Sequence, residues 1–144
     1  MNIKSTFLLI FTICFIPAAF GQNELKIEKS ENERLVEVLN SSELIGENRA
    51  SYLSVRIYKI DNGSGSAGIP EGHEVSHNLL IAVSEFDEEP NQNLFEVGPF
   101  YNPKFIKWND IKEYEREVQI EYGSYSSRKD VILKININGL KVVK

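Results

Sequence analysis

The chain has 144 residues, a formal net charge of −5 and one cysteine, and this length is sufficient for one domain with its own core. The acidic residues are spread along the chain and the basic residues do not cluster, which excludes a surface built to bind nucleic-acid phosphates. The only cysteine, Cys14, lies in the apolar N-terminal segment. Removal of that segment leaves no thiol for disulfides, nucleophilic catalysis or metal binding.

The first 21 residues have the pattern of a secretory signal peptide. Lys4 gives a basic start, residues 5–16 are almost wholly apolar or small, and Ala19 and Gly21 place small side chains before the expected cleavage point. The apolar part is shorter than the roughly 20 residues that span a membrane, although an uncleaved N-terminal anchor is the alternative. We therefore expect export to the periplasm or the medium, with no stable membrane insertion after cleavage, and a single globular β-rich domain over residues 22–144.

The first part of this domain is expected to contain a short helix, a connector and a strand. Ser30 and Glu33 are spaced as a capping box, which favours a short helix within residues 24–44, although the same segment also alternates as a strand. Residues 45–50 are polar and predict a connector. In Ser51–Ile60, apolar residues alternate with polar and tyrosine residues, which predicts a half-buried strand.

The rest of the chain predicts further short strands separated by turns. The segment Asn109–Arg116 is expected to form a helical turn or two, and Asn138-Gly139 a two-residue hairpin turn, since both residues tolerate positive φ. The expected strands lie in residues 79–86, 93–97, 105–108, 118–122, 131–137 and 140–142. The pattern predicts an all-β fold with a small α contribution, an antiparallel β-sandwich or open barrel of six to seven short strands.

One motif suggests catalysis. His73-Glu74-Val75-Ser76-His77 matches the His-Glu-x-x-His pattern and resembles the active-site helix of thermolysin-like and related zinc proteases. On a helix, residues four apart share a face, so both histidines would bind zinc while Glu74 acts on its water. The resemblance therefore implies a minimal zinc metallohydrolase with metal ligands His73 and His77 and the catalytic residue Glu74.

The surrounding sequence favours the interpretation that this motif is not catalytic. No third histidine is present to complete the zinc site, and the apolar run after His77 suits a strand at least as well as a helix. In a strand, positions 73 and 77 would be about 13 Å apart, too far for one metal ion. We therefore expect Asp61–Ser76 to be a long glycine-rich loop followed by a central strand, with no catalytic residue, metal or other cofactor, and keep the zinc site as the alternative.

The loop and the exposed face of the preceding strand are the candidate binding surface. Loops rich in glycine and serine either connect elements or recognise partners. Alternation places the side chains of Tyr52, Arg56 and Tyr58 opposite the core, and the loop contributes three polar side chains. The candidate binding residues are Arg56, Tyr58, Asn62, Ser64 and Ser66.

A short stretch is similar to small exported lysozyme inhibitors of bacteria. Ser54-Val55-Arg56-Ile57-Tyr58 and the loops around Ser64 and Ser124 resemble segments of these proteins. The resemblance implies a β-rich domain that inserts loops into the cleft of an extracellular hydrolase such as a lysozyme. It transfers no functional residue.

Together these features favour an exported, non-catalytic β-domain that binds a protein or a cell-envelope component through loops. A zinc hydrolase and a hydrolase inhibitor are the alternatives. Nucleic acid is not an expected partner.

Overall fold

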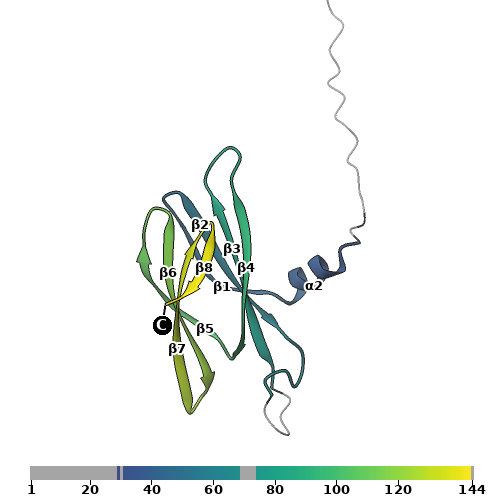
Figure 1. Ribbon diagram of the computed structural model, residues 1–144. Helices are drawn as coiled ribbons and strands as arrows, with labels where there is room; N and C mark the ends of the chain where they lie inside the picture. Colours follow the sequence, from purple (N-terminus) through teal and green to yellow (C-terminus); the bar gives the residue numbers. More distant parts are fainter. Residues whose placement is uncertain (1–28, 30, 69–73, 144) are drawn as a thin grey trace, which may run out of the picture. The chain divides into compact units, whose positions relative to one another are not determined.

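Two antiparallel four-stranded sheets pack against each other in the computed structural model, which describes residues 29, 31–68 and 74–143 (Figure 1). The first sheet contains, in spatial order, β1 (Glu43–Ala50), β2 (Leu53–Asp61), β3 (Ser76–Glu85) and β4 (Gln92–Tyr101). The second contains β5 (Lys104–Ile111), β6 (Glu115–Ser124), β7 (Ser127–Asn136) and β8 (Gly139–Val142). The predicted all-β sandwich is confirmed, with eight strands rather than six or seven. The predicted signal peptide, Cys14 and His73 lie outside the described residues.

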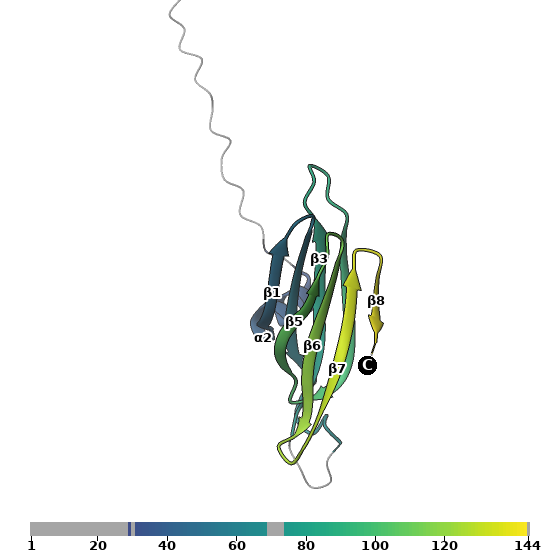
Figure 2. The ribbon, with the colours of Figure 1, turned by 90° about the vertical axis from the view of Figure 1, so that its left-hand side faces the viewer.

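The chain completes one sheet before it starts the next. Each sheet is a meander in which consecutive strands pair, and Asn102-Pro103 carries the chain from β4 to β5. Arg128 holds this crossover, because its Nη1 donates to the carbonyl oxygens of Asn102, at 2.8 Å, and Gly123, at 2.9 Å. Figure 2 looks onto the face of the second sheet, with β5–β8 in front and α2 (Glu33–Ser41) behind.

The core lies between the sheets and follows the alternation that the sequence predicts. Leu53, Val55 and Ile57 of β2 are 0% exposed, as are Leu133 and Ile135 of β7. The other buried side chains of the core come from β3, β4, β6, β7 and the β7–β8 turn: Leu79, Ile81, Val83, Phe100, Val118, Ile120, Val131 and Ile137. Burial of these side chains from water is the main source of stability, at about 25 cal/mol per Å² of apolar surface.

The predicted helix forms as α2, although its cap differs from the expected one. The side chain of Asn32, not that of Ser30, accepts the free backbone N–H of Leu35 at 3.0 Å. The helix contacts β2 on the side of the first sheet that faces away from the second sheet (Figure 1). Two apolar side chains on this outer face, Ile60 and Leu80, are only 3% and 6% exposed. Within the part of the chain that the structure describes, no helix has the length and apolar character needed to cross a membrane.

The segment predicted as a polar connector is the edge strand β1. Register places Gly46, Asn48 and Ala50 opposite the inward residues of β2, so its core-facing positions are small or polar. A β-bulge at Ile45 also breaks the alternation. A Cβ on Gly46 would lie 2.7 Å from the Phe105 ring, so glycine permits the close approach of β1 to β5.

Two further local predictions were wrong. Asn109–Arg116 is not helical, because it comprises the end of β5, a turn and the start of β6. The β7–β8 turn also lies one residue earlier than predicted. Asn136 pairs with Gly139, so Ile137 and Asn138 form the turn, and neither has a positive φ.

Candidate functional site

The histidine of the zinc motif that the structure describes forms part of a sheet. His77 is the second residue of β3 and lies directly opposite Asp61 of β2. Its Nε2 is 3.0 Å from Asp61 Oδ1. Its Nδ1 is buried without a hydrogen bond of good geometry, although the backbone of Phe100 is close enough to favour the protonated ring.

The active-site helix of a zinc protease is not formed here. Glu74 is exposed on the loop before β3, and the chain from Ser76 onward is strand rather than helix. Over residues 31–68 and 74–143, no three His, Cys, Asp or Glu side chains lie close enough to hold a metal ion. The hypothesis of a helical His-Glu-x-x-His site is therefore wrong for the part of the motif that is described.

Burial sets the acid–base behaviour of His77. Loss of water around the ring lowers the pKa of His77 below its ordinary value of about 6.5, because burial outweighs the opposing attraction of Asp61. The unfolded chain therefore binds the proton more readily than the folded protein. Stability contributed at this site is fully present above about pH 6.5 and is lost as the pH falls from there toward the lowered value.

We expect this difference to appear in unfolding measurements. Urea unfolding of the wild type between pH 7.5 and 5.5 should show a fall in the free energy of unfolding below about pH 6.5. His77→Gln should make that fall shallower, because it removes the group whose pKa shifts. An equally steep fall in the variant would show that other groups cause it.

The predicted binding loop is anchored at its base by polar side chains. Asn62 Nδ2 donates to Ser76 Oγ at 3.1 Å and to Asn78 Oδ1 at 3.0 Å, and Ser66 Oγ accepts the backbone N–H of Ser76 at 2.7 Å. Asn62 and Ser66 thus join the first part of the loop to the start of β3. Ser64 lies in the turn between them.

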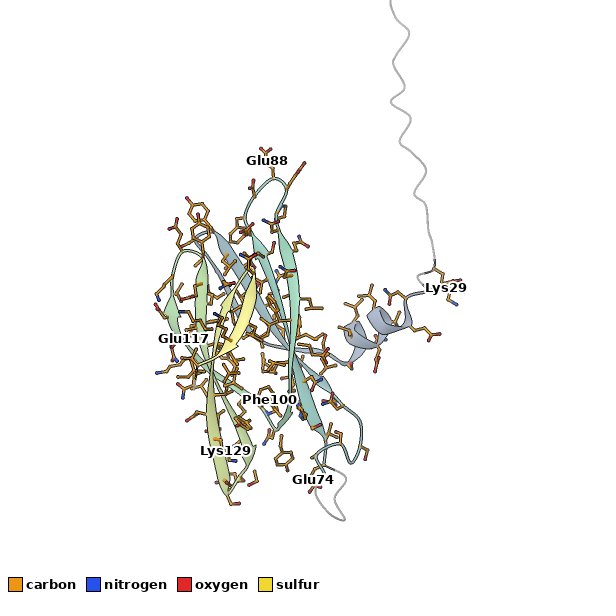
Figure 3. All side chains as sticks on the ribbon, viewed as in Figure 1. Lys29, Glu74, Glu88, Phe100, Glu117 and Lys129 are labelled. Atoms are coloured by element: carbon orange, nitrogen blue, oxygen red, sulfur yellow. The ribbon has the colours of Figure 1, made fainter. Side chains whose placement is uncertain are left out.

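The two strand residues of the predicted binding set lie elsewhere. Arg56 and Tyr58 are on the outer face of β2, and Arg56 Nε pairs with Glu47 Oε1 at 2.8 Å. The structure therefore does not join the predicted residues into one pocket. Figure 3 shows that Glu74, beside the loop, and Glu88, in the β3–β4 hairpin, lie at opposite ends of the sandwich.

An open groove of about 700 Å³ lies on the outer face of the first sheet, toward the β3–β4 hairpin. Its floor consists of short side chains, and its edges carry arginine, aromatic and leucine side chains. The Arg49 guanidinium lies 5.9 Å from the centroid of the Phe86 ring, a cation–π contact. The lining residues include Arg49, Ser54, Arg56, Ala82, Ser84, Phe86, Gln92 and Leu94.

Three exposed aromatic side chains adjoin this groove, and we call them the aromatic platform: Tyr52, Phe86 and Tyr114. The rings of Tyr52 and Tyr114 stack with centroids 5.4 Å apart and planes 15° apart, yet the residues are 51% and 53% exposed. The backbone N–H of Phe86 donates to the carbonyl oxygen of Tyr52 at 3.2 Å. A hollow of about 400 Å³ is lined by the platform together with Glu85 and Asp87. Glu85 and Phe86 line both hollows, so groove and platform are adjacent.

A buried arginine holds the two turns that carry the tyrosines. Arg116 is 0% exposed, and its guanidinium donates to Asn48 Oδ1 at 2.7 Å and to the carbonyl oxygens of Leu53 and Glu115 at 2.9 Å each. It also donates to the carbonyl oxygens of Ala50 and Lys112.

These contacts satisfy all the donors of Arg116 and surround both turns. Each of the five guanidinium N–H groups has a partner, and the described partners are all neutral oxygens. Ala50 and Leu53 flank Tyr52, while Lys112 and Glu115 flank Tyr114. Burial lowers the pKa of Arg116, yet an arginine keeps its charge in a protein. Arg116 therefore holds the two turns that carry the stacked Tyr52 and Tyr114.

The sequence identifies only part of this surface. Alternation places Tyr52 and Arg56 opposite the core, but it does not bring Tyr114, Phe86 or Arg116 to them, because those contacts connect distant strands. One sequence signal for the buried Arg116 was available. It precedes the alternating Val118 and Ile120 by two residues, so a period of two places it on the inward face of β6.

In comparisons with known proteins, the chain matches no protein-family model, no curated protein and no solved structure.

Proposed function

We propose that this protein is an exported, non-catalytic domain that binds a protein or a cell-envelope component. Export rests on the predicted signal peptide. Binding rests on one observation above all, the open groove next to exposed aromatic rings on the outer face and end of the first sheet. Inhibition of an extracellular hydrolase would be one form of such binding.

The groove has the composition of a recognition surface. Tyrosine, phenylalanine and arginine are enriched where proteins bind partners, because they combine large contact area with polar ends. The exposed Arg49 pairs its charge with an aromatic ring, whereas the neighbouring Arg56 pairs with Glu47. The Arg49 guanidinium is thus the cation in the groove that is placed to receive a partner's polar group.

Sedimentation with envelope fragments of the producing organism tests this function. The wild type should sediment with the fragments, and Arg49→Ala should raise the dissociation constant about fivefold, the effect of roughly 1 kcal/mol. Lys129→Ala is the matched control, since it removes another exposed cation, on β7 (Figure 3). Failure of the wild type to sediment, or equal losses in both variants, would contradict the proposal.

A further inference from the structure

We infer that the aromatic platform and the adjoining groove bind an uncharged, linear oligosaccharide. This inference rests on the proposed binding function and names the chemical class of the ligand. Three features support it: the charges that line the groove and the platform, the fixed positions of the platform rings, and the exposure of these rings to solvent.

The platform is ordered before any ligand binds. Exposed aromatic side chains normally move between rotamers, but Tyr52 and Tyr114 are held by their mutual stacking and by turns fixed to Arg116. Ordering in the free protein reduces the entropy lost on binding. A fully satisfied guanidinium buried beneath two surface turns thus provides rigidity where two half-exposed rings are presented to solvent.

The charges around the surface favour an uncharged ligand. Glu85 and Asp87 line the platform hollow, and Arg49 lines the groove, where Glu85 is also present and Arg56 is paired with Glu47. A cationic ligand would meet the Arg49 guanidinium, and an anionic ligand would meet the two carboxylates. A chain without charge can contact both hollows, donating hydroxyl protons to the carboxylates and accepting from the Arg49 guanidinium.

The arrangement of rings and polar groups suits sugar units. A flat stacked pair offers an apolar surface to the C–H face of a pyranose ring, and the neighbouring polar side chains bond its hydroxyls. Partial burial of the ring and, to a lesser extent, the nearby carboxylates raise the pKa of Tyr114 above its ordinary value of about 10, and its hydroxyl is a hydrogen-bond donor at neutral pH. A peptide that binds by adding a strand is not suited to this surface, because it pairs with the edge of a sheet, whereas the groove lies on a sheet face.

The two hollows together have room for several sugar units in line. The hollow of about 400 Å³ at the platform lies next to the groove of about 700 Å³, and Glu85 and Phe86 line both. The short side chains of Ser54, Ala82 and Ser84 let a ligand lie close to the sheet. A linear oligosaccharide that stacks on the platform would therefore continue along β2, β3 and β4.

Titration with three soluble hexasaccharides tests the inference: β-1,4-linked glucose, β-1,4-linked N-acetylglucosamine and β-1,3-linked glucose. At least one should bind at millimolar concentration or below and shift the backbone amide signals of Tyr52, Phe86 and Tyr114 in nuclear magnetic resonance spectra. Tyr52→Ala and Tyr114→Ala should each weaken binding about tenfold. Thermal unfolding of both variants should stay close to that of the wild type, since the side chains are half exposed.

Tyr125 provides the matched control. It is 100% exposed in the β6–β7 turn, at the other end of the sandwich, and Tyr125→Ala should bind as the wild type does. The inference is wrong if none of the three hexasaccharides binds, if the shifts lie away from the platform, or if the Tyr52 and Tyr114 variants bind normally. Envelope binding that survives both tyrosine substitutions would overturn the oligosaccharide site and leave the proposed binding function intact.

Discussion

Replacing Arg116 with methionine is expected to lower the free energy of unfolding by about 3–5 kcal/mol, a large part of the roughly 5–15 kcal/mol that stabilises a typical folded protein. The substitution keeps much of the side-chain volume but removes all donors from five oxygen acceptors. Each buried acceptor left without a partner costs about 1–3 kcal/mol, part of which local rearrangement and entering water recover. Chemical denaturation at neutral pH measures the loss.

Arg49→Met is the matched control for this substitution. Arg49 is exposed and makes a cation–π contact with Phe86, so the free energy of unfolding should change by less than about 1 kcal/mol. A loss below about 1 kcal/mol for Arg116→Met would show that the two turns do not depend on the guanidinium. Arg116→Lys should also destabilise strongly, because a single ammonium has three donors and cannot reach both turns as a planar fork does.

The second large effect is expected at the centre of the core. Ile81→Ala should lower the free energy of unfolding by about 2–5 kcal/mol, because Ile81 is 0% exposed and its removal leaves a cavity between the sheets. Ile81 lies opposite Ile57 of β2 and Phe95 of β4, so the strands on both sides of β3 lose contacts.

An isoleucine of the same chain at the surface gives the comparison. Ile106 on β5 is 43% exposed, and Ile106→Ala should cost less than about 1 kcal/mol. Equal losses at the two positions in thermal or urea unfolding would argue that the inner faces of the two sheets do not form the core described above.

The fold was predictable where the hydrophobic alternation is uninterrupted. In residues 53–57 of β2 and 131–135 of β7, every second residue is apolar, and these are the positions buried between the sheets. The same rule fails in β1, because its inward residues are the small Gly46 and Ala50 and the polar Asn48. Their identities reflect contacts with Phe105 and Arg116, residues far along the chain that a local pattern does not reveal.

The candidate site was less predictable than the fold for a related reason. The glycine-rich loop and the His-Glu-x-x-His motif are visible as sequence patterns, but the groove and platform combine residues from β1 to the β5–β6 turn. Arg116 also looks like an ordinary surface charge until register places it opposite Ile135 in the core. Pairing between distant segments therefore determines the site.

Nuclear Overhauser contacts between the rings of Tyr52 and Tyr114 in the unliganded protein show whether the buried Arg116 orders the exposed aromatic platform before any ligand binds. We expect clear ring-to-ring contacts in the wild type, consistent with the 5.4 Å centroid distance, and their loss in a folded Arg116→Lys protein. Freely averaging rings in the wild type, or contacts that persist unchanged in that variant, would contradict this role of Arg116.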